Sequence, residues 1–358
     1  MRAARAVTPV APGVWPEVLA SDPGATIYQT PAWGRAVRRA SDMADASRLY
    51  VLEDGRRLVL PMMRASPLPG VAVDASYPSG YGSGGLLASG GLRASDVRLV
   101  LSDLRHSGAV STRIRANHHT AGRWDPGLVP GVLSTPRRVE VLDLDGGFAH
   151  VWSARFQSSA RRAVRKAEQA GLDVERDTSG RLVPAAYDLY LRWTRRRAEE
   201  AGLPVRLAEA LARRREPLRT FEAVAAECGD SCRVWAAWHR GELVAAIVTL
   251  VHGDHATYWH GYSHKAVAGP TRANNLLHRL AIEDAIDSGC RYYSMGESGG
   301  VAELVRFKQT FGATPRRAVE VRIERLPLTR LERLAGRGRA HAADALARLT
   351  QLGRTPNP

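Results

Sequence analysis

Short apolar runs alternate with Gly- and Pro-rich turns along the first 145 residues of the chain. Residues 49–52 and 57–62 flank Glu53-Asp54-Gly55, which predicts a β-hairpin. Further strands are expected at residues 110–115 and 139–144, and helices at residues 33–40 and 97–107. Pro31 stands near the start of the first helix, where its fixed φ is tolerated.

After residue 147 the pattern changes to longer helical segments followed by strands. Helices are predicted at residues 148–170, 182–200, 207–227 and 271–288, and strands at residues 233–239, 242–251, 256–262 and 290–295. Gly171 marks a helix end, and Pro217 interrupts the third helix. A loop is expected to carry residues 306–308, and residues 328–352 are expected to form an Arg-rich amphipathic helix or helix pair. This order predicts a mixed α/β chain.

The composition indicates the number of domains and the cellular compartment. A chain of 358 residues suggests two domains, and 44% hydrophobic with 24% charged residues is sufficient for a buried core. No apolar run approaches the roughly 20 residues of a membrane span, and the N-terminus lacks the apolar stretch of a signal peptide. The three cysteines, Cys228, Cys232 and Cys290, have no metal-type spacing. We therefore expect a cytoplasmic protein without a transmembrane segment.

The net charge of +15 indicates a polyanionic partner: nucleic acid, a phosphorylated substrate or an anionic membrane face. Only 6% of residues are aromatic, which disfavours generic single-strand binding. Three of the 51 basic residues are lysines, namely Lys166, Lys265 and Lys308. Where arginine is the default cation, a retained lysine indicates a need for a compact ammonium group.

Five segments carry motifs in a fixed order: Tyr28-Gln29-Thr30-Pro31-Ala32-Trp33, Tyr81-Gly82-Ser83-Gly84-Gly85, Arg161 to Gly171, Asn274 to Tyr293, and Phe307-Lys308 with Phe311-Gly312. Together they resemble the Fem-type aminoacyl-tRNA-dependent peptidyl transferases. The resemblance implies an α/β (α+β) fold of two tandem acetyltransferase-like (GNAT) domains with mixed sheets flanked by helices. Residues 1–147 would form the first, acceptor-side domain, with the tail 319–358 packing on it. Residues 148–318 would form the second domain, which carries the Phe-Lys segment.

The resemblance also implies an activity. An aminoacyl ester on a tRNA 3′ end is already activated, so an amine acceptor attacks it without a covalent enzyme intermediate if the enzyme orients both and stabilises the oxyanion. Lys308 would stabilise that charge, and Phe307 would pack against the terminal adenosine or the acceptor. No metal and no cofactor besides the aminoacyl-tRNA co-substrate is expected. The substrate-binding residues implied are Trp33, Arg38, Tyr81, Arg206, Tyr258, Tyr262 and Glu297, and the tRNA phosphate contacts are Arg161, Arg165, Lys166, Thr271 and Arg272.

Two positions depart from the family pattern and leave the acceptor open between a peptidoglycan precursor and a secondary-metabolite or peptide amine. Ser294 stands where an acid is usual, and Ala210 stands where a Tyr follows the Arg of peptidoglycan-acting members. An acyl-CoA-dependent N-acyltransferase on the same fold is the first alternative, although Gly269 alone does not make a pyrophosphate loop. A non-catalytic nucleic-acid-binding protein is the second. The histidines between residues 252 and 264 favour structural roles over a zinc site. The sequence does not indicate an oligomeric state.

Overall fold

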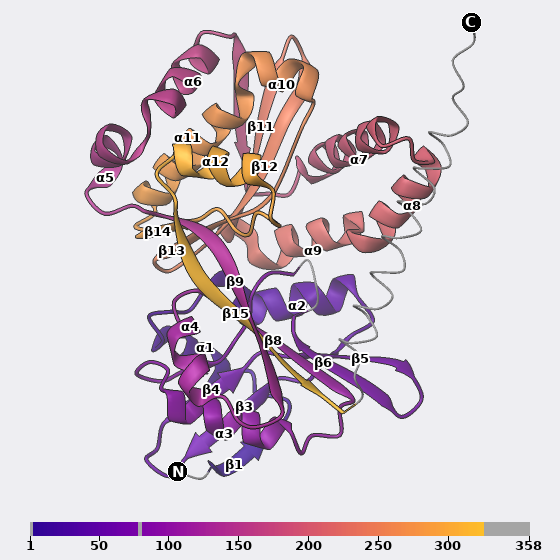
Figure 1. Ribbon diagram of the computed structural model, residues 1–358, viewed down its shortest axis with the longest axis vertical. Coiled ribbons are helices and arrows are strands. Elements are labelled where there is room, and N and C mark those ends of the chain that lie inside the picture. Colours follow the sequence, from indigo (N-terminus) through magenta and orange to yellow (C-terminus); the bar gives the residue numbers. More distant parts are fainter. Residues whose placement is uncertain (1–2, 78–80, 326–358) are drawn as a thin grey trace, which may run out of the picture.

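The computed structural model describes residues 3–77 and 81–325. The chain forms two parts, stacked one above the other and joined by two long strands, β9 (Val132–Asp143) and β15 (Thr314–Glu324) (Figure 1). The predicted Arg-rich segment at residues 328–352 lies outside the described residues. No helix within the described ranges is long and apolar enough to cross a membrane.

The first part holds short strands and small helices. Its elements are β1 (Ala3–Val7), α1 (Val14–Ala20), α2 (Pro31–Ala40), β2 (Ala44–Asp45), β3 (Arg48–Leu52), β4 (Arg57–Leu60), β5 (Met63–Leu68), β6 (Val71–Ser76), β7 (Leu87–Ala88), α3 (Ala94–Leu104), β8 (Ser111–Ala116) and α4 (Ala121–Trp124). The predicted hairpin is confirmed, since β3 pairs with β4 in antiparallel register. The predicted first helix is also confirmed: Pro31 is its first residue, and the Thr30 hydroxyl caps it by accepting from the Trp33 amide at 3.1 Å.

The second part has the longer elements expected from its sequence. They are α5 (Gly147–His150), the π-helix η3 (Val151–Arg155), α6 (Ser158–Glu168), β10 (Leu172–Asp177), α7 (Val183–Glu200), α8 (Val205–Arg215), α9 (Leu218–Cys228), β11 (Cys232–His239), β12 (Glu242–His252), β13 (His255–Ser263), α10 (Lys265–Thr271), α11 (Ala273–Asp287), β14 (Tyr292–Ser294) and α12 (Ala302–Thr310). Pro217 ends α8 and begins α9, because proline cannot donate an interior helix bond.

One mixed sheet runs through both parts. Among the described residues, the strand order is β10-β11-β12-β13-β14-β9-β15-β8-β6-β5-β2 in the larger sheet and β1-β3-β4-β7 in the smaller one. β15 pairs with β9 from Thr314 onward and with β8 from Val319 onward. Residues 319–324, assigned in advance to a tail, therefore add a strand to the first part.

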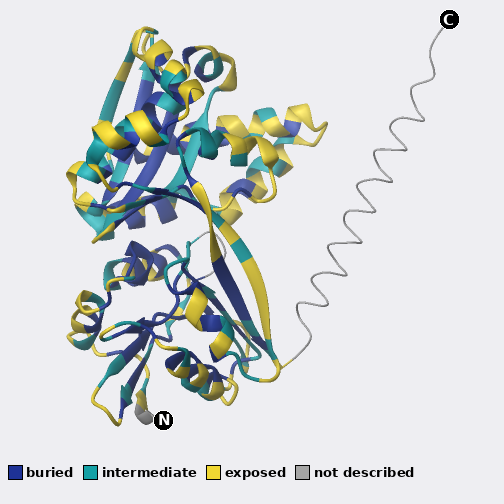
Figure 2. Ribbon diagram, turned by 60° about the vertical axis from the view of Figure 1, so that its left-hand side comes forward, coloured by how far each residue is buried: buried dark blue, intermediate teal, exposed yellow. Residues whose placement is uncertain are grey.

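The sheet of the second part is buried on both faces, which explains the continuous apolar run in β12. Ala246, Val248 and Leu250 pack in one cluster with α2, α7 and α9. Val244 and Ile247 belong to another cluster with α11 and α12 on the opposite face. Because α2 comes from the first part and α9 from the second, one core joins the two parts (Figure 2).

Three local expectations were wrong. Residues 148–170 do not form one helix, because the chain turns out of η3 at Phe156 and restarts at Ser158. Residues 306–308 lie on helix α12 and not in a loop, since residues 302–310 contain no Gly or Pro and follow the Gly299-Gly300 turn. Strands β10 and β15 were not anticipated from the sequence.

Candidate active site between the two parts

The strands β13 and β14 part at the centre of the molecule. They pair in parallel only from His255–Tyr292 to Thr257–Ser294, and β13 then continues to Ser263 while residues 295 and 296 bond to Glu140 of β9. A β-bulge at Trp259 shifts the register of β12 and β13 at the same level. Bulges re-aim side chains, so Trp259 leaves the β12 ladder here, while Tyr258 still pairs with Thr249 of β12 but lies beyond the pairing of β13 with β14.

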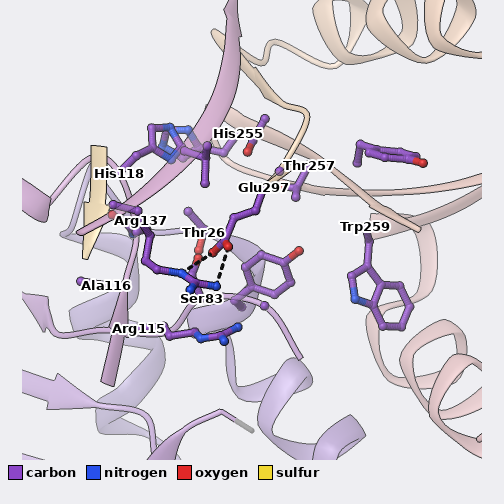
Figure 3. A pocket seen from close by; sticks show the side chains of 18 of the residues that line it. Thr26, Ser83, Arg115, Ala116, His118, Arg137, His255, Thr257, Trp259 and Glu297 are labelled. Atoms are coloured by element: carbon purple, nitrogen blue, oxygen red, sulfur yellow. Dashed lines mark hydrogen bonds and ion pairs between the residues drawn. The ribbon is translucent and has the colours of Figure 1, made fainter. Parts of the chain in front are cut away.

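A cavity of about 360 Å³, here called the central cavity, lies beside this opening and is lined by both parts of the chain. Figure 3 shows Arg137 and Glu297 reaching toward one another within it, with His118 and His255 on one side and Trp259 on the other. Arg115 and Ser83 come from the first part, whereas Thr257 and Glu297 come from the second. Glu297 is the one carboxylate among the residues that line the cavity.

Two cations fix the segment that carries Glu297. Arg137 holds its carboxylate through contacts of 2.6 and 3.3 Å (Figure 3). The Lys308 ammonium donates to the backbone carbonyls of Gly296 at 3.0 Å and Glu297 at 2.9 Å. Lys308 is 1% exposed, and its burial lowers its pKa to about 8 although Glu140 and Glu297 act in the opposite direction. An ammonium group has three donors, so one remains beyond the two carbonyls.

A second cavity, of about 370 Å³ and here called the side cavity, lies beyond Tyr258 between α7, β13 and α12. Tyr258 lines both cavities, and Phe307 forms the far wall of the side cavity. Gly261 is required beside Tyr258, because a Cβ there would lie 2.3 Å from the tyrosine hydroxyl. Burial raises the pKa of Tyr258 to about 12, so its hydroxyl keeps its proton at neutral pH.

A third hollow, here called the basic pocket, opens on the other side of Phe307. Arg162 and Lys166 of α6, Arg272 and Phe307 line it with uncharged residues of α11 and α12. These three cations are exposed, and no carboxylate of the described residues lies within 4.0 Å of them. Phe307 thus links the basic pocket to the side cavity, and Tyr258 links the side cavity to the central cavity.

Histidines surround the central cavity in neutral form. The His119 ring packs at a tilt against the rings of His118 and His255, with centroids 3.9 and 4.0 Å apart, and His255 stacks on Tyr292. Burial lowers the pKa of His118 to about 4 and of His119 to about 2, and it also lowers the pKa of His255. The described residues contain no group of three or more ligands that could hold a metal.

The structure brings together some of the residues predicted from the sequence. Tyr258 and Glu297 line the central cavity, Tyr262 and Phe307 line the side cavity, and Lys166 and Arg272 line the basic pocket. The Tyr262 hydroxyl donates to Glu216 at 3.2 Å and also contacts His260. Lys308 sits behind the Glu297 segment and is not a lining residue of the central cavity.

Other predicted residues have structural partners. Trp33 is fully buried and donates to the Tyr81 carbonyl at 3.1 Å, and the Tyr81 hydroxyl bonds to Thr220 of α9 at 2.9 Å. Both residues therefore join the two parts. Arg161 donates to the carbonyls of Trp152, Ser153 and Phe156. The Thr271 hydroxyl donates to Val267 at 2.8 Å.

Arg38, Arg165 and Arg206 are exposed and line none of the three cavities described above. Sequence reasoning missed Arg115, Arg137, His118 and His255, all of which line the central cavity. No alternation marked Arg137, because it stands beside Arg138 and has the same parity as the apolar residues Val139 and Val141. No sequence signal connects His118 to His255, which lie 137 positions apart and meet only through the sheet.

Comparison with known proteins identifies the second part. Residues 154–309 match the acetyltransferase (GNAT) domain family. A search of curated proteins gives no match. The matched region contains α6 to α12, so the second part has the likeness of a GNAT domain.

Solved structures extend the likeness to both parts. The crystal structure of FemX superposes with a TM-score of 0.64 at 11% identity, covering 88% of this chain and 96% of that one. A conserved protein of unknown function from Bacteroides thetaiotaomicron gives 0.54 at 10% identity, with 88% and 98% covered. The structure of L-PGS from Bacillus licheniformis gives 0.51 at 13% identity, with 89% and 94% covered. The predicted α/β fold and its Fem-like tandem GNAT architecture are confirmed, whereas the boundary at residue 147 stays a prediction.

Proposed function

We propose that this protein transfers an aminoacyl group from aminoacyl-tRNA to an amine acceptor and forms an amide bond. One observation carries the proposal: a bare basic pocket, the side cavity and the central cavity follow one another, separated only by Phe307 and Tyr258. The phosphates of an RNA 3′ end fit the basic pocket. The terminal nucleoside then lies along Phe307, with the ester carbonyl at Tyr258.

The acceptor belongs in the central cavity. Its amine lies next to Glu297, because an ammonium group is drawn to the one carboxylate that lines the cavity. Arg215, whose side chain is 81% exposed and lies 3.9 Å from Glu216, lines the same cavity and favours an acceptor that also carries an anionic group. A peptidoglycan precursor and a peptide or secondary-metabolite amine with a carboxylate or phosphate both fit this description.

The reaction needs little covalent chemistry from the protein. The free amine attacks the ester carbonyl, the N–C bond forms, and the bond from carbon to the ribose oxygen breaks. The proton that the nitrogen loses as it becomes an amide passes to that oxygen, which leaves as a hydroxyl. Glu297 accepts the proton that the acceptor ammonium loses. Tyr258, protonated at neutral pH, donates a hydrogen bond to the leaving oxygen.

Lys308 acts on this site from behind. Its ammonium is bonded to the carbonyls of Gly296 and Glu297, so it fixes the Glu297 segment and adds positive charge near the developing oxyanion. Lys308 is a positioning residue in this account, and Arg137 holds the same segment at its carboxylate end.

Two features favour tRNA over acyl-CoA as the donor. Only Arg272 separates α10 from α11, so no Gly-rich loop precedes α11 to bind a pyrophosphate. The cations of the basic pocket, which have no carboxylate partner among the described residues, lie instead beside Phe307. A longer polyanion can follow α6 from there.

The test supplies RNA-free protein with tRNA charged with labelled amino acids, together with peptidoglycan precursor or small anionic amines. Label in an alkali-stable amide product is expected, and RNase treatment of the donor abolishes it. Transfer from acetyl-CoA that survives RNase would contradict the proposal and favour the acyl-CoA alternative. Binding of tRNA without transfer to any acceptor would favour a non-catalytic role.

A further inference from the structure

Three exposed leucines, here called the leucine stripe, lie on helix α8 and in the loop that joins it to α7. Leu203, Leu207 and Leu211 are 58%, 56% and 57% exposed, and they follow one another at steps of four residues. Leu207 and Leu211 therefore share one face of α8, and Leu203 lies in the loop just before this helix begins at Val205. Figure 2 shows exposed residues running along the helices that project from the side of the second part. Contiguous exposed apolar side chains indicate an interaction site for another molecule or a membrane.

Arginines flank the leucine stripe. Residues 192–215 contain eight arginines and three glutamates. Arg206, Arg213 and Arg214 are exposed, and no carboxylate of the described residues lies within 4.0 Å of them. Leucines bordered by free arginines on one helix face are typical of helices that lie in the interface of an anionic bilayer.

The hairpin connects this surface to the cavities. Arg215, one turn beyond Leu211, lines the central cavity, and Trp193 and Arg197 of α7 line the side cavity. A partner seated on the leucine stripe therefore lies within a few helical turns of the acceptor site.

We propose that the leucine stripe and its flanking arginines dock this protein on an anionic lipid bilayer surface. The leucines enter the headgroup and acyl boundary, and the arginines contact lipid phosphates. RNA would use the arginines but gains nothing from three exposed leucines. A second copy of this chain would bring another set of arginines against the first, so like charges would face each other. The proposal does not depend on the reaction catalysed.

Vesicle co-sedimentation of the full chain tests the docking surface. We compare vesicles of phosphatidylglycerol and phosphatidylcholine in equal parts with vesicles of phosphatidylcholine alone. The wild type is expected to bind the anionic vesicles and to lose binding as salt rises. The variant Leu203→Ser/Leu207→Ser/Leu211→Ser should bind at least about tenfold more weakly. Arg206→Gln/Arg214→Gln should weaken binding by about fivefold per arginine removed.

Matched controls separate docking from general surface effects. Leu68→Ser/Leu133→Ser removes two exposed leucines from the first part, and Arg105→Gln/Arg123→Gln removes two exposed arginines there. Both controls should bind anionic vesicles like the wild type. Three results would overturn the proposal: no vesicle binding by the wild type, unchanged vesicle binding by the triple Leu variant, or a dimer in light scattering that the triple Leu variant abolishes. Loss of tRNA binding in the Arg variant, with vesicle binding intact, would instead assign this face to RNA.

Discussion

The central cavity and the basic pocket both contain arginine, but the two sites hold it in opposite states. In the central cavity Arg137 is paired with Glu297, and Arg115 donates to Glu320 at 2.7 Å. In the basic pocket Arg162, Lys166 and Arg272 face solvent without a carboxylate partner among the described residues. Pairing with a carboxylate, and not the number of basic residues, therefore distinguishes cations that shape a site from cations that are free to bind an anion.

The largest effect on the reaction rate is expected next to the central cavity, where Lys308 holds the Glu297 segment. Lys308→Met removes the ammonium that holds the carbonyls of Gly296 and Glu297, so product formation should fall by about 100- to 1,000-fold. Binding of tRNA should stay within about twofold, because Lys308 does not line the basic pocket. Steady-state rates and filter binding measure the two quantities.

Arg306→Met provides the matched control, since Arg306 is an exposed cation on the same helix. It should retain near-normal rates. Full activity in a folded Lys308→Met protein would remove Lys308 from the mechanism. Loss of tRNA binding in that variant would show that Lys308 acts on the donor and not on the Glu297 segment.

The second largest effect on the rate is expected at Tyr258, which lines both the central cavity and the side cavity. Gly261→Ala places a Cβ 2.3 Å from the Tyr258 hydroxyl and should displace that ring, lowering the rate by about 100-fold. Overpacking should also cost about 1–3 kcal/mol in the free energy of unfolding. Gly108→Ala, which meets nothing within 4 Å, is the control for both measurements. An unchanged rate in Gly261→Ala would exclude Tyr258 from the reaction.

Acid should weaken the central cavity through its histidines. Burial lowers the pKa of His118, His119 and His255 in the folded chain, so below about pH 6.5 the unfolded chain binds protons that the folded chain does not. Stability is fully present above pH 6.5 and should drop by about 2 kcal/mol or more as the pH falls to about 4. Urea unfolding at several pH values measures this loss.

Histidine substitutions test whether these rings, and not other groups of the chain, cause the loss of stability in acid. His118→Asn/His119→Asn should flatten the pH dependence, whereas His106→Asn, an exposed histidine on the first part, should leave it steep. Parallel curves of stability against pH for the wild type and both variants would mean that these histidine rings do not control acid stability.

The sequence predicted α2, α3, the β3–β4 hairpin and most elements from α6 to β14, because their patterns are local, but it missed β1, α1, β5, β6 and β7. Alternation in residues 48–60 and the Pro31 helix start depend on neighbours a few positions away. Strands β9 and β15 were missed or truncated because their exposed portions lack an apolar alternation, and the pairing of Thr314 with Val141 joins residues far apart in sequence. Helix α12 was mistaken for a loop because its short, mixed sequence follows two glycines.

The predicted site residues that belong to one short motif lie close together in the structure, whereas side chains that meet only through the fold were not predicted. Phe307, Lys308 and Glu297 were identified and lie close to the opening in the sheet. Trp33 has the family motif, but its buried ring joins α2 to Tyr81 and contacts Trp259 at 5.4 Å between centroids. The Arg137–Glu297 pair depends on the antiparallel pairing of β9 with β14, which joins residues far apart in sequence and which no local pattern encodes.

The central claim is that the donor and the acceptor are bound by different arginine environments, the bare basic pocket and the paired central cavity. Kinetics with aminoacyl-tRNA and acceptor varied separately test it most directly. Arg162→Gln/Lys166→Gln should raise the KM for aminoacyl-tRNA by about tenfold and reduce its salt dependence, while the KM for the acceptor stays unchanged. Arg137→Gln should raise the KM for the acceptor and leave that for the tRNA unchanged. Equal changes of both KM values in either variant would contradict the account.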